Sequence, residues 1–310
     1  MRIVCDTYIP FLVEAVQKEW PQVEICPMKP KQIDAEAVRD ADVLVVRTRT
    51  RVDEALLAGS SVRLVCTATI GFDHIDTAYC EAHGIRWMSC PGCNAQAVCD
   101  YIEQALLETQ AKGTIGIVGV GHVGSLVAKM AERKGMTVLL NDPPKEIGVS
   151  LDFIAQNSDI ITFHVPLDET TYHLCDEAFL QKCKPNALII NAARGGVVDE
   201  KALLRSGHPY ILDTWENEPD INHEVLQHAL RASMHIAGYS IEGKRNATQM
   251  CLDVIAQTFE IPSVNIANFR YAAREESAPK SNDRWLETIT LQLKNHSELF
   301  EKLRKEYPLR

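Results

Sequence analysis

The sequence predicts an α/β protein with two Rossmann-like, doubly wound parallel-sheet domains and a cleft between them. Short apolar segments alternate with helical segments along most of the 310-residue chain. Continuously apolar strands are typical of parallel sheets that are covered on both faces, and their alternation with helices indicates βαβ units. A glycine-rich loop, GVGHVG, follows an apolar strand and begins a helix, which favours the same fold class.

The first domain is predicted over residues 1–93, with a returning segment at 238–256. Its strands are expected in the short segments RIVCD, VLVVR, RLVCT and IRWMS, with a helix at Phe11–Trp20 after the first strand. Helical stretches between the other strands complete one α/β layer unit. This domain is expected to act as the substrate, or lid, domain.

The second domain is predicted over residues 94–237, beginning with a helix at 95–111. Residues 257–310 are expected to form a linker and a short C-terminal segment that contains helix formers with a broad apolar face. The strands of the second domain are expected at 115–118, 137–142, 159–165, 187–193 and 210–214.

Charge and hydropathy exclude several classes of function. The formal net charge is −10, which argues against a nucleic-acid-binding or anionic-membrane-binding surface. No run of 18 apolar residues is present, so no transmembrane helix is expected. The N-terminal residues have the pattern of a buried strand and not of a signal peptide, which favours a cytoplasmic protein.

Ten cysteines are present, and most of them lie within or beside apolar runs. Such cysteines behave as small buried hydrophobic residues and stay reduced in a chain that is not exported. Cys90–Cys93 forms one CxxC pair, but no second pair with matching spacing follows, as a zinc site would require. We therefore interpret CPGC as a Pro-Gly turn and predict no metal.

The glycine loop predicts a dinucleotide site. Gly119 permits the tight turn, Gly121 allows close approach of a pyrophosphate, and Gly124 allows the helix to pack on the strand. Asp142 ends the next strand, where an acid accepts hydrogen bonds from a ribose hydroxyl and repels a 2′-phosphate. We therefore expect NAD rather than NADP, with a glycine-rich turn that binds no ligand as the alternative.

Three polar motifs follow later strands: NAARGG with Arg194, LDTWENEP with Asp213 and Glu218, and MHIAGY with His235. An arginine can hold a substrate carboxylate bidentately, and a histidine supported by a carboxylate can exchange a hydroxyl proton reversibly. Arg, Glu and His therefore form the set that oxidation of a 2-hydroxy acid needs. The alternatives are a surface arginine, a glutamate in a turn and a structural histidine.

The chain resembles the D-isomer-specific 2-hydroxyacid dehydrogenases. The motifs that carry the resemblance are RTRTRVDEALL, TATIGFDHID, PGCNAQAV, GIVGVGHVG, LLNDPP, NAARGGVVDE, LDTWENEPDIN and HIAGYSIEGK. Within this family it is similar to members that oxidise 4-phospho-D-erythronate to 2-oxo-3-hydroxy-4-phosphobutanoate in pyridoxal 5′-phosphate (vitamin B6) synthesis. The resemblance also implies a homodimer.

Residue roles follow from this resemblance at the matching positions. It implies that Arg194 binds substrate, that Glu218 pairs with the histidine and that His235 is the acid/base. Cofactor contacts are implied for Asp142, Asp213 and Gly238, and at Val165, where the family commonly has threonine. Substrate contacts are implied for Thr48, Thr69 and Tyr239.

A phosphorylated substrate requires cations on this acidic protein. RTRTR offers Arg47, Arg49 and Arg51, which would face one side of an extended segment, and we expect Arg47 and Arg49 to hold the 4-phosphate. A solvated basic rim is the alternative. For the whole chain, the rival hypotheses are another acid, such as 3-phosphoglycerate or an unphosphorylated 2-hydroxy acid, and a non-enzymatic NAD sensor.

Departures from the family pattern shorten the chain. The join QAKGTIGIVG is tight, residues are lost between Arg194 and Glu218, and the C-terminal dimerisation segment is abbreviated. Met234 replaces the usual proline before His235. These departures affect cofactor affinity and oligomer geometry, and they leave the Arg, Glu and His positions intact.

Overall fold

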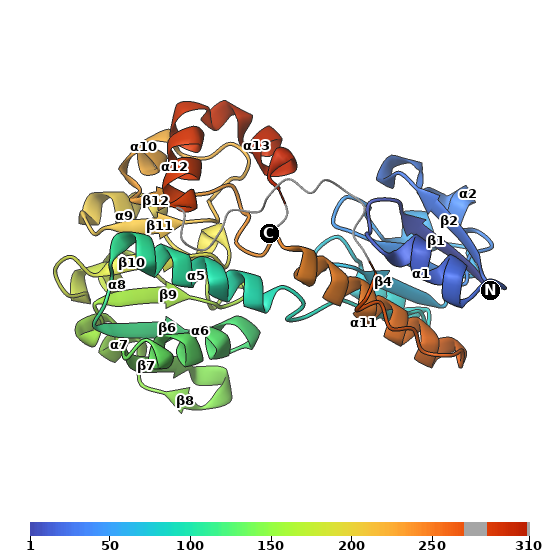
Figure 1. Cartoon of the computed structure of the whole chain (residues 1–310), viewed down its shortest axis with the longest axis horizontal. Helices are drawn as coiled ribbons and strands as arrows, with labels where there is room; N and C mark the ends of the chain where they lie inside the picture. The colour runs from blue at the N-terminus through green and yellow to red at the C-terminus, as the bar shows by residue number, and fades with distance from the viewer. Residues whose placement is uncertain (270–283, 309–310) are drawn as a thin grey trace. The chain divides into compact units, whose positions relative to one another are not determined.

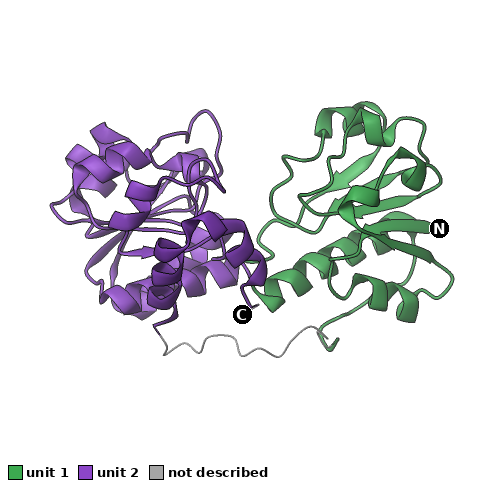
Figure 2. Cartoon of the chain, turned by 90° about the horizontal axis from the view of Figure 1, so that it is seen from above, with its two compact units in different colours: residues 1–94, 240–275 green, residues 95–239, 276–310 purple. Residues whose placement is uncertain are grey.

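The computed structural model describes residues 1–269 and 284–308. The chain divides into two compact units: unit 1 is Met1–Asn94 with Ser240–Glu275, and unit 2 is Ala95–Tyr239 with Glu276–Arg310 (Figure 2). The segment 257–310, which the sequence predicts as one linker and terminal part, is therefore divided between the units. The α/β class with two predominantly parallel sheets is confirmed.

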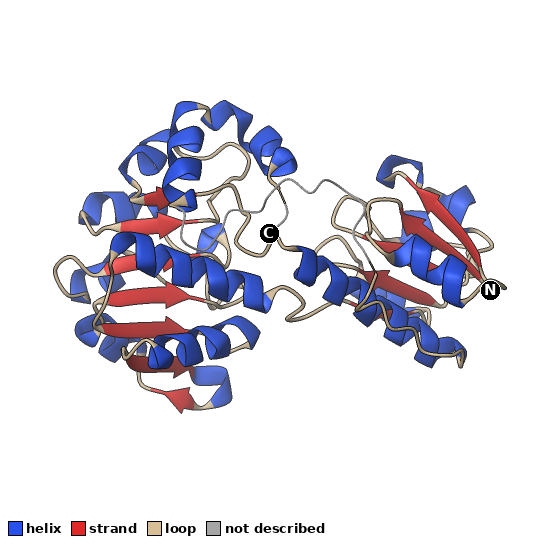
Figure 3. Ribbon diagram, in the orientation of Figure 1, coloured by secondary structure: helices blue, strands red, loops and turns tan. Residues whose placement is uncertain are grey.

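In unit 1, helices surround one sheet (Figure 3). Its five strands are parallel and have the order β2-β1-β3-β4-β5. The second strand, Glu24–Met28, was not expected from the sequence. It lies at the edge of the sheet and carries Pro27, which is tolerated at an edge and weakens the strand signal. The strands are β1 (Arg2–Asp6), β2 (Glu24–Met28), β3 (Val43–Val46), β4 (Leu64–Thr67) and β5 (Arg86–Met88).

Both faces of this sheet are covered by helices. Cys5 and Val45 belong to one buried cluster with residues of α11, whereas Val4 and Leu44 belong to a second cluster on the opposite face. Successive strand residues point to opposite faces, which explains why the strands are apolar throughout. The helical elements are α1 (Leu12–Glu19), η1 (Pro30–Gln32), α2 (Ala35–Val38), α3 (Glu54–Leu57), α4 (Thr77–Ala82) and α11 (Ile241–Phe259).

Unit 2 contains a seven-stranded sheet in the order β12-β11-β10-β9-β6-β7-β8 (Figure 1). Only β8 runs antiparallel, and it lies at an edge. β8 and β12 have two residues each, too few to give a periodic signal. The strands are β6 (Thr114–Val118), β7 (Thr137–Asp142), β8 (Ile147–Gly148), β9 (Ile160–Phe163), β10 (Leu188–Asn191), β11 (Tyr210–Leu212) and β12 (Arg231–Ala232).

The strand order of unit 2 reverses at β6, which pairs with β7 on one side and with β9 on the other. Open α/β sheets bind ligands outside the carboxyl ends of the strands at such a switch point. The helical elements before the C-terminal segment are α5 (Ala95–Thr109), α6 (His122–Arg133), η2 (Pro143–Lys145), α7 (Leu151–Asn157), α8 (Glu177–Lys182), η3 (Gly195–Val197), α9 (Glu200–Ser206) and α10 (His223–His228).

The C-terminal helices α12 (Trp285–Asn295) and α13 (Phe300–Glu306), joined by η4 (Ser297–Leu299), pack on unit 2. The buried Glu108 carboxylate accepts the N–H groups of Leu286 and Glu287 and pairs with Arg231 at 2.8 Å. The apolar side chains of α12 and α13, including Phe300, belong to the core of unit 2.

The cysteines and the length of the helices bear on the described chain as a whole. All ten cysteines are free, and eight of them are buried. No helix in the described ranges is long and apolar enough to cross a lipid bilayer.

Candidate active site

Arg194, Glu218 and His235 line one pocket of about 580 Å³ on unit 2. They follow β10, β11 and β12 respectively, three strands that are neighbours in the sheet. Because parallel strands end at the same edge, residues distant in sequence meet there. The sequence motifs that predict a catalytic set therefore converge in the structure of this unit.

His235 and Glu218 form a hydrogen-bonded pair, with 2.9 Å between Nδ1 and Oε2. The other carboxylate oxygen of Glu218 accepts the N–H of Trp215 at 2.9 Å. Burial alone would raise the pKa of Glu218, but the hydrogen bond and charge of His235, the Trp215 N–H and the charge of Arg304 together lower it below its ordinary value. Glu218 is therefore ionised and orients the imidazole.

His235 adopts a left-handed backbone conformation, with φ of 58°. Its N–H donates to the Asp213 carbonyl at 2.8 Å, which helps to hold this uncommon conformation. The side chain is 32% exposed, and its Nε2 makes no hydrogen bond to any described residue. Nε2 is thus available to a substrate.

Arg194 is held by hydrogen bonds that involve backbone carbonyl groups, and not by an ion pair. Its carbonyl accepts Asn191 Nδ2 at 2.8 Å, and its Nη1 donates to the Ala193 carbonyl at 2.8 Å. Within the described ranges no carboxylate pairs with this guanidinium. Arg194 therefore keeps its charge available for an anionic ligand.

Asp213 is 1% exposed and lies beneath the His235 segment. Its carboxylate accepts hydrogen bonds from Ser233 Oγ and from the N–H groups of Ile236 and Ala237, at 2.7–2.9 Å. Through these hydrogen bonds the Asp213 carboxylate holds the turn around His235 in place. The cofactor contact that the family resemblance implies for Asp213 stays a prediction.

The glycine loop fits a dinucleotide. A Cβ on Gly119 would lie 2.7 Å from the His164 carbonyl oxygen, and one on Gly124 would lie 2.0 Å from the Gly119 carbonyl oxygen. Beside Gly121, by contrast, there is open space that a pyrophosphate can approach. The helix α6 begins immediately after Gly121 without a side-chain cap, so its first N–H groups are available to an anion.

Asp142 ends β7, and its Oδ2 accepts the Val120 N–H at 2.8 Å. The carboxylate therefore lies directly beside the glycine loop, as a ribose-binding acid requires. Val165 follows β9 and is half-buried. Burial lowers the pKa of His164 to about 3, so this neighbouring imidazole is neutral at neutral pH.

Gly238 and Tyr239 lie in the tight turn after His235, where the Tyr239 N–H donates to the Ile236 carbonyl at 2.9 Å. Both are half-buried, and the rings of Tyr239 and Tyr307 lie 6.4 Å apart between centroids. Both predicted residues therefore lie in the turn that directly follows His235.

The remaining predicted substrate residues belong to unit 1. Thr48 and Arg49 are exposed, and the half-buried Thr69 lies 2.6 Å from the Thr67 hydroxyl, between the two Oγ1 atoms. Arg47 Nε pairs at 3.1 Å with Asp6, whose side chain is fully buried. Asp6 was not identified from the sequence, although an acid at the end of the first strand is a usable signal.

The expectation that RTRTR is extended is wrong. Residues 48–50 form a turn, in which the Thr50 N–H donates to the Arg47 carbonyl at 3.2 Å. Arg51 pairs with Asp53 at 3.4 Å. The prediction assumed that alternate residues of an extended segment face the same side. Because the segment after β3 is a turn, that argument does not apply to the three arginines.

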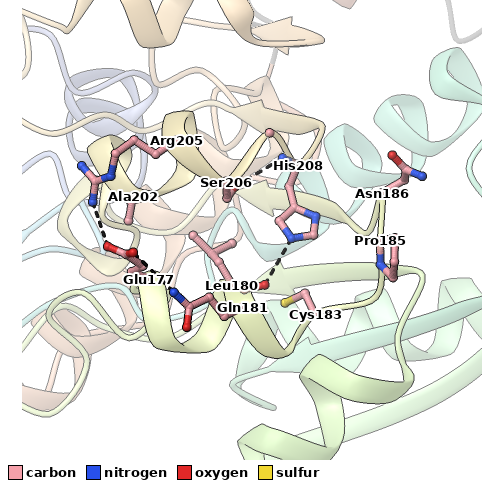
Figure 4. A pocket seen from close by; sticks show the side chains of 11 residues that line it. Glu177, Leu180, Gln181, Cys183, Pro185, Asn186, Ala202, Arg205, Ser206 and His208 are labelled. Atoms are coloured by element: carbon pink, nitrogen blue, oxygen red, sulfur yellow. Dashed lines mark hydrogen bonds and ion pairs between the residues drawn. The ribbon is translucent and has the colours of Figure 1, made fainter.

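A second hollow, of about 510 Å³, lies between α8 and α9 of unit 2 (Figure 4). No predicted site residue lines it. Its arginine, Arg205, pairs with Glu177 at 3.1 Å, and His208 Nε2 lies 3.2 Å from the Leu180 carbonyl oxygen (Figure 4). The arginine of this hollow is thus paired with a carboxylate, whereas Arg194 is paired with none among the described residues.

Sequence reasoning missed two acids and a histidine in the active-site region. His173 and Glu216 form a close pair with 2.5 Å between Nε2 and Oε1, and both line the pocket. Glu200 is 2% exposed, and burial and the nearby acids Glu216, Glu218 and Asp199 raise its pKa to about 7, against a lowering by the Glu216 N–H. No sequence signal distinguishes it from an ordinary helix-starting acid.

No group of three or more His, Cys, Asp or Glu side chains converges as a metal site within residues 1–269 and 284–308. Cys90 and Cys251 approach to 3.9 Å between their sulfur atoms in the core of unit 1. Burial raises the pKa of the Cys93 thiol to about 12, which is typical of an inert structural cysteine.

Comparison with known proteins agrees with this geometry. The family model described as "D-isomer specific 2-hydroxyacid dehydrogenase, NAD binding domain" matches residues 96–237. Among solved structures, an NAD⁺-bound 3-phosphoglycerate dehydrogenase of Entamoeba histolytica has a TM-score of 0.71 and 25% identity, covering 84% of this chain and 95% of that one. The TT0316 protein of Thermus thermophilus has a TM-score of 0.72 at 23% identity, covering 85% and 98%, and shares the fold.

Curated relatives are more similar in sequence. An erythronate-4-phosphate dehydrogenase of Bacteroides fragilis is 43% identical over the whole of this chain and 97% of that protein. One of Klebsiella pneumoniae (strain 342) is 40% identical over 90% of this chain and 77% of that protein. The chain therefore belongs to the erythronate-4-phosphate dehydrogenase family, within the D-isomer-specific 2-hydroxyacid dehydrogenases.

Proposed function

We propose that this chain catalyses the NAD-dependent oxidation of 4-phospho-D-erythronate to 2-oxo-3-hydroxy-4-phosphobutanoate, a step of pyridoxal 5′-phosphate biosynthesis. The observation that carries the proposal is the His235–Glu218 pair, 2.9 Å apart, in one pocket with an arginine that has no ion pair to any described residue. The substrate is the one named for relatives that are 40–43% identical to this chain over the aligned regions.

His235 acts as the acid/base. The Glu218 carboxylate accepts a hydrogen bond, so Nδ1 carries the proton and Nε2 is the basic nitrogen. Nε2 takes the proton of the C2 hydroxyl during oxidation, and Glu218 stabilises the imidazolium that forms. In the reverse direction the same nitrogen returns the proton.

Arg194 binds the substrate carboxylate. Its planar guanidinium can donate two parallel hydrogen bonds, which fixes the orientation of C2 as well as its charge. Asp213 holds the turn that carries His235, through the N–H groups of Ile236 and Ala237. Together these contacts place the base and the carboxylate clamp at fixed positions in unit 2.

NAD is held by the glycine loop and by Asp142. Gly119, Gly121 and Gly124 let the backbone approach the pyrophosphate, and Asp142 accepts a ribose hydroxyl. Val165 and Gly238 are further proposed contacts. The bound nicotinamide supplies the hydride acceptor.

Unit 1 supplies the remaining substrate contacts in this proposal. Thr48 and Thr69 are proposed substrate contacts and Arg49 a proposed contact of the 4-phosphate; Tyr239 is a proposed substrate contact of unit 2. Arg47 uses its Nη groups for the 4-phosphate, because Asp6 occupies only its Nε within the described chain. We also propose a homodimer in the cytoplasm, a reducing compartment that suits ten free cysteines.

Turnover of the purified protein with NAD tests the proposal. Substrates are 4-phospho-D-erythronate, 3-phosphoglycerate and D-lactate, with a 2-oxo acid present to reoxidise retained NADH and direct detection of the oxo-acid product. Product from phosphoerythronate alone is the expected result. Activity only on another acid would keep the mechanism and remove the substrate assignment.

The variant His235→Asn separates an enzyme from a non-enzymatic NAD sensor. It should lose about 10²–10⁴-fold in turnover, the usual contribution of general acid–base catalysis, while its affinity for NAD stays the same. Retained turnover in this variant would refute the role of His235. NAD binding without product from any acid in the unaltered protein would favour the sensor.

A further inference from the structure

Trp215 and the peptide bond that joins it to Glu216 contact the segments that carry Arg194, Glu218 and His235. The Trp215 N–H donates to Glu218 Oε1 at 2.9 Å, which leaves Oε2 for His235. The Trp215 indole donates to the Ser233 carbonyl at 2.8 Å, two residues before His235. Trp215 therefore fixes the position of Glu218 through its N–H and that of the histidine segment through its indole, and the peptide bond to Glu216 holds Trp215.

The arginine segment touches the same peptide. A Cβ placed on Gly195 would lie 2.0 Å from the Trp215 carbonyl oxygen and 2.6 Å from the Glu216 nitrogen. Only glycine allows this approach, so the residue after Arg194 packs backbone to backbone against the peptide. A shift of this peptide would move Arg194, Glu218 and His235 relative to one another.

The Glu216 N–H of this peptide is held by Glu200, whose Oε1 accepts it at 2.7 Å. Glu200 is the first residue of α9, after the N-cap Asp199, and its side chain is buried. No lysine, arginine or histidine pairs with it among the described residues, and its charged neighbours Asp199, Glu216 and Glu218 are acids. A buried acid without a cation is costly, so this contact is not explained by charge stabilisation.

We propose that Glu200 is a positioning residue, which fixes the Trp215–Glu216 peptide and through it the geometry of Arg194, Glu218 and His235. Its carboxyl oxygen acts as a hydrogen-bond acceptor and takes no part in proton transfer. The inference rests on the proposed function, since it concerns the geometry of that same site. It assigns Glu200 no contact with substrate or cofactor.

The test uses two substitutions at Glu200. Glu200→Ala removes the acceptor, leaves the Glu216 N–H unsatisfied and should lower kcat about 10- to 100-fold, with the Kd for NAD changed less than about twofold. Glu200→Gln keeps a carbonyl oxygen in the same place and should retain kcat within about threefold at neutral pH. Should Glu200→Ala fail to fold, Glu200→Asp, which withdraws the oxygen by one methylene, replaces it under the same criterion.

A matched control exists in the same unit. Glu177 is the first residue of α8 after the N-cap Asp176, as Glu200 is in α9, but it is exposed and pairs with Arg205 (Figure 4). Glu177→Ala should leave kcat unchanged. This control separates the loss of a helix-starting acid from the loss of the contact with Glu216.

A second readout does not depend on turnover. The downfield proton resonance of His235 Nδ1–H, identified by its loss in His235→Asn, should shift or broaden in Glu200→Ala and persist in Glu200→Gln. An unchanged resonance and kcat in Glu200→Ala, or equal losses in both variants, would overturn the proposal. If the unaltered protein turned over no 2-hydroxy acid, the proposed function would fail while the resonance still tested Glu200.

Discussion

The carboxyl ends of the two sheets both carry arginines, but the two regions use the charge differently. In unit 2, Arg194 follows β10 and bonds only its neighbouring carbonyl within the described chain. In unit 1, Arg47 follows β3, and its Nε is 3.1 Å from the fully buried Asp6 carboxylate. Both arginines therefore lie at the carboxyl edge of a sheet. They differ in that Arg47 is paired with a carboxylate, whereas the charge of Arg194 is available to a ligand.

The strongest test of this comparison is Arg194→Lys. A lysine keeps the charge but loses the bidentate geometry, and we expect kcat/KM to fall about 10³-fold, or roughly 4 kcal/mol of transition-state stabilisation. Arg205→Lys, in the second hollow, is the matched control and should change kcat/KM less than about twofold, since Arg205 is exposed and already paired. Equal effects of the two changes would contradict the role of Arg194.

The next effect concerns the charge that supports His235. Glu218→Gln preserves size but removes the negative charge, so the imidazolium formed in the reaction loses its stabilisation. We expect kcat to fall about 10²-fold, or roughly 3 kcal/mol, in steady-state assays. Glu224→Gln, at an exposed position of α10, is the control. A Glu218→Gln variant with full kcat would show that the pair is structural.

A third prediction concerns the pH dependence of the unfolding free energy. Glu200 is a buried acid like Asp6, but no described cation pairs with it, whereas Asp6 pairs with Arg47. Its pKa in the folded protein is about 7, above the ordinary value of 4.5. Between these two values the folded state binds more protons than the unfolded state, so stability decreases as pH rises from about 4.5 to about 7 and stays lower above it. Glu200→Gln lacks this dependence.

Urea unfolding at pH 4.5 and pH 8 measures the difference. Relative to the unaltered protein, Glu200→Gln should gain roughly 3 kcal/mol in unfolding free energy between the two pH values. A constant difference between the two proteins would mean that Glu200 does not titrate in this range.

The smallest effect is expected at Arg47. Arg47→Gln removes the partner of the buried Asp6 carboxylate and one proposed phosphate contact. KM for the phosphorylated acid should rise about tenfold, or roughly 1.4 kcal/mol, with kcat little changed. The KM for NAD serves as the control and should stay the same, because NAD makes no contact with the proposed phosphate site. An unchanged KM for 4-phospho-D-erythronate would remove Arg47 from the phosphate site.

The parts of the fold that the sequence predicts are those with a strong local signal. β7 was expected at 137–142 and is observed there, since its apolar run ends at a polar residue. β2 was missed because Pro27 and partly exposed side chains mask an edge strand. β8 and β12 are defined only by pairing with their neighbours, which no local pattern reveals.

The same distinction applies to the site. Arg194, Glu218 and His235 stand out because each belongs to a polar motif that follows an apolar strand, and that local signal was enough to place them at one edge. Glu200 and Asp6 gain their roles from burial and from partners 16 and 41 residues away. The expected extended RTRTR segment failed because turn formation at 48–50 overrides a pattern of alternating residues.

The discontinuity of unit 1 has a consequence during synthesis. One face of its sheet is covered by α11, whose buried residues include Cys251 and Ile255. The ribosome completes all of residues 95–239 before this helix, which takes roughly 7–30 s at about 5–20 residues per second. For that time only α1 covers this face of β1, β3 and β4, so part of the apolar surface of the nascent chain stays exposed until α11 emerges.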